Sequence, residues 1–451
     1  LTAATGTGYI SLNTNGTIPA SGSCTVTVNV TSTTPGIYNN TSGQVVGDTG
    51  TGNRASDTLV VMAPLVIAKS FATNPVAIGT ATVLTITLTN PNPVAVTGAA
   101  FTDTYPSGLV NTASASPATT CGGTPTITAA NGGSSLAVGG SGASVPANSS
   151  CTVTVNVQSA ASGSYANSSG AVTTDNAGSS AAATAVLNVL APPIVLKSFT
   201  PSQISSGGQS NLQLVIGNPS TNTAALTGVV LSDNYSGTMT NAAAYTSLIC
   251  TDGSSATISG GVNGGTSVGI TAGTIQPGGT CTINQLVTAT SSNTNTTTAP
   301  TSTNGGTGTA AAAYLQVTQA LLVSKTFSVA RTTRTTVFVM TISLTNPNSL
   351  AVTNVAFTDT YPTAPSTITN SGAANATWAS GACTGTLTAA NNGPSLALTN
   401  GTVPAGGVCT ITVNVMFPAA AVNNRVVTNS TGNVTAANAP GTNDGAAAVI
   451  V

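Results

Sequence analysis

Short segments of the chain alternate apolar residues with hydroxyl or amide residues at a period of two. The clearest are TVLTITLTN at 82–90, CTVTVNV at 24–30 and again at 151–157, and CTITVNV at 409–415. Such alternation is typical of a strand that buries one face and exposes the other. Asn-Pro, Gly-Gly and Asn-Gly clusters separate these segments and are typical of turns. The pattern therefore predicts an all-β protein.

The strand pattern recurs along the chain with a period of 128 residues. The frames IAKSF, VLKSF and VSKTF mark it through their lysines, Lys69, Lys197 and Lys325. A unit of this length is much longer than a solenoid repeat and is long enough to bury a core of its own. Each unit offers about seven to nine strand signals, which is typical of an immunoglobulin-like sandwich. We therefore predict tandem immunoglobulin-like β-sandwich domains in a rod-like array.

The repeat divides the chain into one half unit and three complete units. The predicted boundaries are 1–64, 65–192, 193–320 and 321–451. Residues 19–30 match residues 146–157, so 1–64 corresponds to the second half of a unit. Half a sandwich cannot bury its apolar face alone and leaves its sheet edges open. Three alternatives remain: the segment was cut from a longer chain, another molecule completes it by strand exchange, or the fold straddles the assumed boundary.

The junctions between units are short. VLNVLAPPIVLKSF runs from the last predicted strand of one unit to the first of the next, and LQVTQALLVSKTF does the same without proline. No flexible Gly/Ser linker intervenes. We therefore expect consecutive domains to stack with restricted angles.

The seven cysteines follow the repeat. Each complete unit holds one pair, which we expect to form a disulfide: Cys121 with Cys151, Cys250 with Cys281, and Cys383 with Cys409. Each bond would close a loop of about 30 residues and add roughly 3–4 kcal/mol. Cys24 corresponds to Cys151 and lacks its partner, so it is predicted to be unpaired or to bridge to another chain. Disulfides indicate an oxidising place, either outside the cell or on its surface.

The composition limits the partners and the kinds of segment that the chain can have. Only 3% of the residues are charged, with 7 Lys+Arg, 8 Asp and neither Glu nor His, and the net charge is −1. A surface with so little charge gives weak repulsion between copies, so we expect self-association. Seven scattered cations do not form the basic stripe that nucleic acid requires. No uninterrupted apolar stretch is long enough for a transmembrane helix, and no signal peptide opens the chain.

One charge pair recurs in a protein that is otherwise poor in charge. The lysine of each frame is followed by an aspartate, which pairs Lys69 with Asp103, Lys197 with Asp233 and Lys325 with Asp359. The pair could form a salt bridge between strands or a Lys–Asp isopeptide cross-link. That reaction ordinarily needs another acid to move protons, and no candidate recurs in every unit. The two residues could also be exposed at strand ends and never meet.

Catalytic chemistry is not expected. Without His or Glu, most acid–base and nucleophile–base arrangements cannot be built, so we predict no enzyme and no catalytic residues. The chain has no CxxC pattern, and its aspartates lack calcium-loop spacing, so no metal or other cofactor is predicted. Carbohydrate binding is an open alternative with little support, because Trp378 is the sole tryptophan and occurs in one unit.

The units resemble a repeat domain of uncharacterised function that occurs in tandem in large bacterial surface proteins. The motifs LKSFTPSQISSGGQSNLQLVIGNPS, GVVLSDNYS and CTITVNV carry the resemblance. The chain departs from the usual pattern at Tyr105 and Tyr361, where Leu is common, and at ARTTRTT (330–336), where Gly is expected. The resemblance implies a secreted, immunoglobulin-like, surface-associated protein. It brings no catalytic residues.

These observations favour a structural function. The first hypothesis is a subunit of an extracellular bacterial assembly, such as a filament, a sheath or a surface layer, with other copies of itself as partners. The alternatives are a stalk segment of a giant adhesin and repeats that bind carbohydrate.

Overall fold

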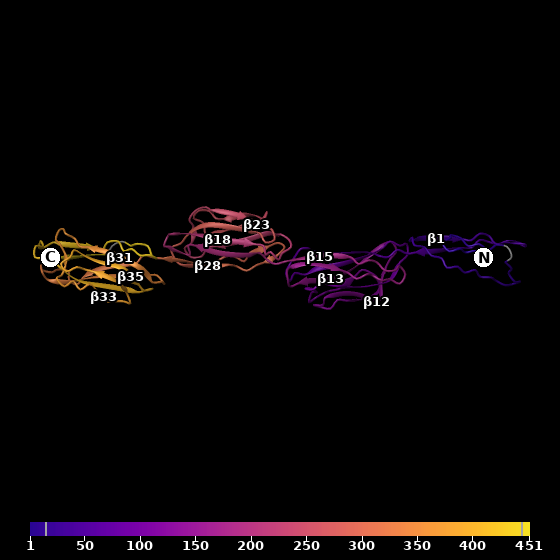
Figure 1. Cartoon of the computed structure of the whole chain (residues 1–451), viewed down its shortest axis with the longest axis horizontal. Helices are drawn as coiled ribbons and strands as arrows, with labels where there is room; N and C mark the ends of the chain where they lie inside the picture. The colour runs from indigo at the N-terminus through magenta and orange to yellow at the C-terminus, as the bar shows by residue number, and fades with distance from the viewer. Residues whose placement is uncertain (14–15, 443–444) are drawn as a thin grey trace. The chain divides into compact units, whose positions relative to one another are not determined.

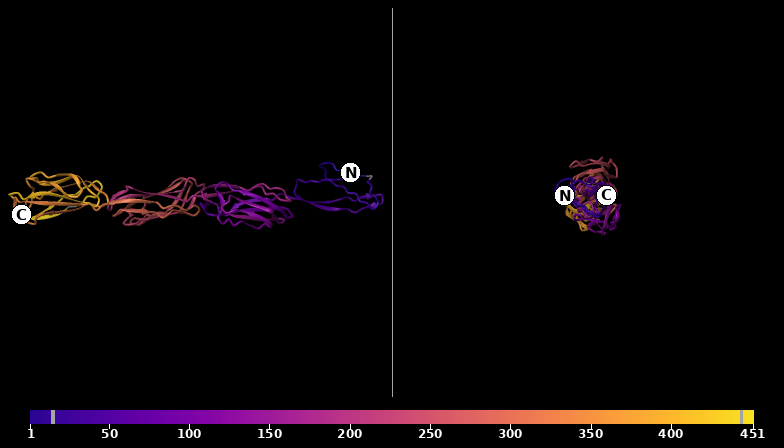
Figure 2. Two further views of the ribbon diagram at one scale, coloured as in Figure 1. Left: turned by 90° about the horizontal axis from the view of Figure 1, so that it is seen from below. Right: turned by 90° about the vertical axis from the view of Figure 1, so that its right-hand side faces the viewer.

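The structure is a computed structural model that describes residues 1–13, 16–442 and 445–451. Within these ranges the chain forms β-strands and no helix. Figures 1 and 2 show that the strands of each complete repeat lie side by side as a layered bundle. The predicted all-β class, with tandem sandwich domains, is confirmed.

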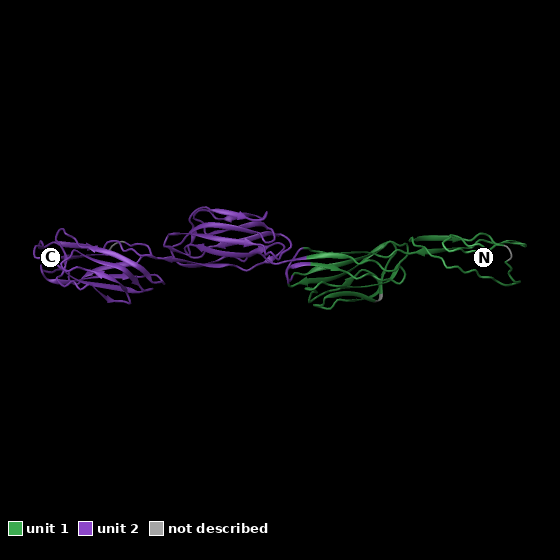
Figure 3. Cartoon of the chain, viewed as in Figure 1, with its two compact units in different colours: residues 1–74, 80–160, 165–187 green, residues 75–79, 161–164, 188–451 purple. Residues whose placement is uncertain are grey.

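The described chain divides into two compact units, which Figure 3 colours separately. The first consists of residues 1–74, 80–160 and 165–187, and the second of residues 75–79, 161–164 and 188–451. The first unit thus holds the half repeat with most of the first complete repeat. The second unit holds the other two complete repeats.

The first complete repeat is built from three sheets. Its strands are β5 (Val66–Phe71), β6 (Val76–Ala77), β7 (Thr82–Asn90), β8 (Val96–Thr104), β9 (Leu109–Asn111), β10 (Ala118–Thr119), β11 (Gly122–Thr128), β12 (Ser135–Val145), β13 (Ser149–Ser159), β14 (Gly163–Ser168) and β15 (Thr184–Leu190). One sheet has the order β10-β13-β7-β5, with β9 also paired to β13. The second is β11-β12-β8 and the third is β14-β15-β6.

The second complete repeat has the same plan. Its strands are β16 (Ile194–Thr200), β17 (Gln203–Ser205), β18 (Gln209–Gly217), β19 (Leu226–Asn234), β20 (Thr240–Asn241), β21 (Ser247–Cys250), β22 (Ser255–Gly260), β23 (Ser267–Ile275), β24 (Thr280–Thr288), β25 (Asn293–Thr296), β26 (Thr301–Ser302), β27 (Gly306–Thr307) and β28 (Ala312–Thr318). The sheet orders are β16-β18-β24-β20, β22-β23-β19-β26-β27 and β17-β28-β25, and β21 also pairs with β24.

The third complete repeat follows the plan again. Its strands are β29 (Leu322–Phe327), β30 (Val337–Thr345), β31 (Val352–Thr360), β32 (Thr369–Asn370), β33 (Thr377–Ser380), β34 (Thr384–Thr388), β35 (Ser395–Val403), β36 (Val408–Met416), β37 (Val426–Ser430) and β38 (Ala446–Ile450). Its sheet orders are β29-β30-β36-β32, β31-β35-β34 and β37-β38, and β33 also pairs with β36.

The alternating pattern explains where the core lies. In β7 every second residue is buried, and Leu84, Ile86 and Leu88 are fully inaccessible, whereas the threonines between them are half-buried. The neighbouring strand β13 pairs with β7 along its length and has the same alternation. Apolar faces from different sheets of the repeat meet in one core, as residues of β18, β19 and β28 do in the second repeat.

Residues 1–64 contain far less regular structure. Their strands are β1 (Gly36–Thr41), β2 (Val46–Gly47), β3 (Gly50–Thr51) and β4 (Ser56–Val61), with β1 paired to β4 and β2 to β3. The strand predicted at 24–30 does not form, and every residue in that segment is exposed. The prediction is wrong because the described part of 1–64 holds no counterpart of β7 to pair with this segment.

Candidate functional site

Each complete repeat contains an ion pair between its first strand and a strand of another sheet. Lys69 on β5 lies with its Nζ 2.8 and 2.7 Å from the two carboxylate oxygens of Asp103 on β8. In the second repeat the Nζ of Lys197 is 2.5 Å from Oδ2 of Asp233, and in the third the Lys325–Asp359 distance is 2.6 Å. The structure thus brings together all six residues that the sequence singled out as recurring charges.

The six side chains are completely inaccessible to solvent. The exposed part of Lys69 and Lys197 is their backbone, which lies on an edge strand of the sheet. Burial removes the hydration of the ammonium groups and thereby lowers the pKa of Lys69 and Lys197, although the aspartate partner opposes this shift. Burial likewise raises the pKa of Asp233 and Asp359, against the pull of the lysine. Burial therefore opposes the charge on Lys69, Lys197, Asp233 and Asp359.

A buried asparagine is the third member of each cluster. The Nδ2 of Asn167 on β14 donates to Oδ2 of Asp103 at 3.2 Å. Asn295 on β25 does the same to Oδ1 of Asp233 at 2.8 Å, and Asn429 on β37 to Oδ2 of Asp359 at 3.3 Å. We call this Lys–Asp–Asn set the triad. It joins all three sheets of a repeat, because each member lies on a strand of a different sheet.

The triad leaves the same atom unsatisfied in every repeat. Oδ1 of Asn167, Asn295 and Asn429 is buried and has no hydrogen-bond partner among the described residues. Oδ1 of Asp359 is also buried and has no hydrogen-bond partner among the described residues. A buried amide oxygen without a partner costs roughly 1–3 kcal/mol, so its recurrence at three equivalent positions demands a reason.

A tyrosine lies beside each triad. Tyr105, Tyr235 and Tyr361 follow the aspartate by two residues, and each phenol donates to an asparagine at 2.7–2.9 Å. Burial raises the pKa of all three phenols, and the neighbouring carboxylate raises it further. These rings help to exclude water from the triad and stay neutral.

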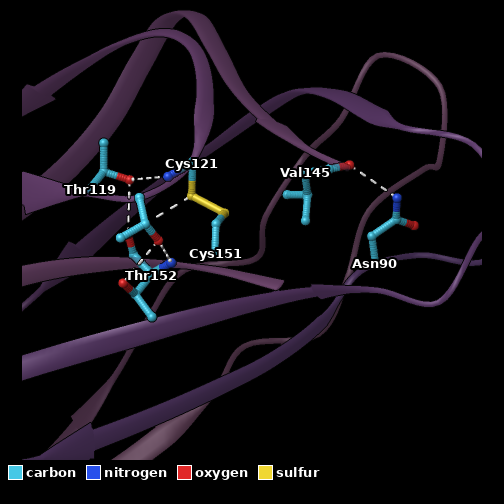
Figure 4. Close-up of a disulfide and its surroundings, with 7 residues drawn as sticks. Asn90, Thr119, Cys121, Val145, Cys151 and Thr152 are labelled. Carbon is cyan, nitrogen blue, oxygen red and sulfur yellow. Dashed lines mark hydrogen bonds between the residues drawn. A yellow bond between two sulfur atoms is a disulfide. The ribbon is translucent and has the colours of Figure 1, made fainter. Parts of the chain in front are cut away.

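The six paired cysteines form the three intra-repeat disulfides expected from their spacing: Cys121–Cys151, Cys250–Cys281 and Cys383–Cys409. Figure 4 shows the first of them, where the segment before Cys121 is held to the neighbouring strand by Thr119, whose hydroxyl donates to the carbonyl of Thr152 at 2.8 Å. The second cysteine of each pair lies on the central strand β13, β24 or β36. Cys24 is exposed and forms no disulfide within the described residues.

The Asn-Pro turns hold the junctions in place. The side chain of Asn92 accepts from the backbone N–H of Ala63 at 2.7 Å and donates to its carbonyl at 2.9 Å. Asn222 makes the same two bonds to Ala191, and Asn348 makes them to Gln319. Figure 4 shows the preceding asparagine, Asn90, donating to the carbonyl of Val145. Each incoming junction is therefore fixed to the repeat that follows it.

The triad asparagines and the junction asparagines were not recognised in the sequence. Asn is abundant in this chain, and Asn167 and Asn429 fall in Asn-x-Ser/Thr sequences that look like glycosylation acceptors. Both are only 1% exposed, which leaves no room for a glycan. A signal did exist, since Asn167 and Asn295 are spaced by 128 residues, the same offset that separates Lys69 from Lys197.

Other kinds of site are not supported by the geometry. Within the described ranges, no group of three His, Cys, Asp or Glu residues is placed to hold a metal ion. Among the same residues no helix is long and apolar enough to cross a membrane. Trp378 packs against the core of the third repeat, and its indole N–H points to the carbonyl of Gly385 at 3.5 Å.

The chain was compared with curated proteins and with solved structures. No curated protein matches the chain. Among solved structures, a putative membrane-anchored protein from Corynebacterium diphtheriae is 9% identical with a TM-score of 0.21, covering 92% of this chain and 97% of the other. The Escherichia coli adhesin FdeC is 12% identical with a TM-score of 0.26, covering 87% of this chain and 99% of the other. These TM-scores are too low to establish a common arrangement.

A family model gives the assignment. The domain of unknown function DUF7933 matches four consecutive segments, residues 1–61, 65–189, 193–317 and 322–451. Together these segments cover nearly the whole chain, and they start within two residues of the boundaries that the repeat predicts. The chain belongs to the DUF7933 family and carries its domain four times in tandem.

Proposed function

We propose that the chain is a structural subunit of an extracellular bacterial assembly, such as a filament, a sheath or a surface layer. The observation that carries the proposal is the recurrence of one set of stabilising contacts in all three complete repeats. Each repeat has a buried triad, a disulfide across its main sheet and an asparagine that fixes the junction before it. Repetition of stabilising contacts suits a function that depends on length and strength.

The disulfides support an extracellular location, and the low charge supports association with other copies of the chain. Disulfide-stapled domains persist in oxidising surroundings outside the cytoplasm. With a net charge of −1 over 451 residues, copies of the chain repel one another weakly. A second copy of the chain is therefore the proposed partner.

Carbohydrate binding has less support. The sole tryptophan packs against a core, and it belongs to the third repeat alone. A shallow depression lined by Arg331, Arg334 and Asn424 also lies in the third repeat. A binding function spread over the repeats would need such a feature in each of them.

Negative-stain electron microscopy of the purified, disulfide-intact chain tests the proposal. Ordered fibres or sheets are the expected result. Isolated strings that stay separate at high concentration would contradict assembly and would favour a stalk that holds another domain away from the cell. Binding of a defined sugar on a glycan array, without assembly, would favour the carbohydrate alternative.

A further inference from the structure

The triad suggests a covalent reaction within each repeat. Its three members are a primary amine, a carboxyl group and a carboxamide, all buried and all in contact through the aspartate. In the first and third repeats the lysine and the asparagine bond to the same oxygen, Oδ2 of Asp103 or Asp359. In the second repeat they bond to different oxygens of Asp233, Lys197 to Oδ2 and Asn295 to Oδ1. In every complete repeat the amine and the carboxamide are therefore each one hydrogen bond from the same carboxyl group.

We propose that in each complete repeat the lysine Nζ forms an isopeptide bond with the side-chain carbon of the asparagine, and that the aspartate carries the protons. The proposed bonds join Lys69 to Asn167, Lys197 to Asn295 and Lys325 to Asn429. This differs from the Lys–Asp cross-link considered on sequence grounds. The aspartate supplies the acid that moves the protons, and the asparagine supplies the acceptor carbon.

The reaction balances without an oxidant or any other co-reactant. The ammonium of the lysine first passes a proton to the aspartate, which leaves a neutral amine and a neutral acid. The amine attacks Cγ of the asparagine. The aspartic acid protonates Nδ2 and takes up the proton that the attacking nitrogen releases, and the C–Nδ2 bond breaks so that Nδ2 leaves as ammonia. The products are one amide, one ammonia molecule and an aspartic acid that keeps its proton, so no buried charge remains.

Burial assists the first step. An ammonium and a carboxylate that are removed from water both gain by becoming neutral, and the desolvation that acts on Lys197 and Asp233 pushes each in that direction. A neutral amine in an apolar pocket is a competent nucleophile, whereas a solvated ammonium is not. Asp233 then serves as the acid and base that the proton transfers require.

The aspartate is a poorer acceptor than the asparagine. At the moment of attack it holds the proton taken from the lysine and is required as the acid and base of the reaction, and its oxygens bond to the lysine and the asparagine. The asparagine is not needed as a proton carrier, and its Nδ2 already lies within hydrogen-bond distance of the aspartate that would protonate it as it leaves. The reaction also removes the buried ion pair, which is costly to keep out of water.

The placement of the bond gives it a mechanical consequence. In the first repeat it would join β5, the first strand, to β14, the strand before the last. Tension applied between the ends of the repeat would then pass through the bond and bypass β6 to β13. This inference goes beyond the proposed function and does not depend on assembly.

Intact mass spectrometry of the full chain, denatured and reduced, tests the proposal. The expected mass lies below that of the sequence by three ammonia molecules, about 51 Da. Digestion should yield one peptide that contains Lys69 joined to Asn167, with matching peptides from the other two repeats. A mass equal to that of the sequence would overturn the proposal, and losses of water would place the bond on the aspartate and overturn it as well.

Variants identify the reacting groups. Lys69→Arg keeps the positive charge but cannot form the amide, so it should reduce the loss to two ammonia molecules, about 34 Da. Asp103→Ala should have the same effect, although Lys69 and Asn167 remain. Asn148→Gly, at an exposed asparagine of the same repeat, is the matched control and should keep all three losses. Persistence of all three in Asp103→Ala would refute the role of the aspartate.

Discussion

The same seven letters, CTVTVNV, occur at residues 24–30 and 151–157 with different structures. At 151–157 they form the centre of β13, and Val153, Val155 and Val157 are at most 1% exposed. At 24–30 no strand forms, and the three equivalent valines are 40–69% exposed. The difference lies in the neighbours, because β13 is paired with β7 on one side and with β9 and β10 on the other.

The comparison shows that an alternating pattern allows a segment to form a strand but is not sufficient for one. The backbone groups of a strand need partners, and its apolar face needs another face to cover it. Both are supplied by the first half of the repeat. Residues 151–157 pair with residues 82–88 of β7, which lie 63 to 75 residues earlier in the sequence. The stabilising contacts follow the same division, since the disulfide and the triad connect the first half of the repeat with the second.

The largest expected effect is the loss of a triad lysine. Lys69→Met leaves Asp103 buried without its partner, so we expect the first complete repeat to lose at least about 3–5 kcal/mol of its free energy of unfolding. Proteolysis across a urea series, read repeat by repeat by mass spectrometry, measures this. The control Arg54→Met, at an exposed position of 1–64, should change nothing beyond about 0.5 kcal/mol. Equal effects of the two variants would contradict the comparison.

The next effect is the loss of a disulfide. Replacing both Cys121 and Cys151 by Ser opens a loop of 30 residues and should cost the repeat about 3–4 kcal/mol in the same assay. Cys24→Ser, at the equivalent of Cys151, should be silent because Cys24 is exposed and unbridged in this structure. A stabilising contribution from Cys24 would show that residues 1–64 are structured differently.

A smaller effect is expected when one core valine loses its two methyl groups. Val155→Ala removes apolar surface from a side chain that is 1% exposed, and we expect a loss of about 2 kcal/mol. The matched variant Val28→Ala changes the equivalent residue, which is 40% exposed, and should cost less than about 0.5 kcal/mol. Circular dichroism during thermal unfolding measures both. A large cost at Val28 would mean that this segment packs against an apolar face.

The smallest effect concerns the junction. Asn92→Ala removes two hydrogen bonds to the backbone of Ala63, and because both are only part-buried, water replaces them and the expected loss is about 1 kcal/mol. We expect faster hydrogen exchange at the Ala63 amide and little change in β13. Exchange at Ala63 that stays slow in the variant would show that another group holds the junction.

Much of the fold could be predicted from the sequence. The strands of β7, β13 and β36 are visible in the alternation, and the spacing of the lysines defines the period. The cysteine spacing anticipates the pairs that the structure brings together, because one pair falls in each complete repeat. The recurring Lys and Asp stood out since so few other residues carry charge.

The rest depends on contacts that short patterns do not encode. Residues 24–30 have the strand pattern but no partner strand. In the equivalent segment 151–157, which does form a strand, the partner β7 lies far away in sequence. Asn167, Asn295 and Asn429 have no special local context, and only the fold places their amides against the carboxylates. Asn92 reads as part of a turn, although its side chain reaches 29 residues back along the chain.

Hydrogen–deuterium exchange of the intact chain tests the central claim, that this pattern becomes a strand only beside the first half of its repeat. The account predicts strong protection of the amides of residues 151–157 and exchange at the rate of an unstructured peptide for residues 24–30. Equal protection of the two segments would contradict it.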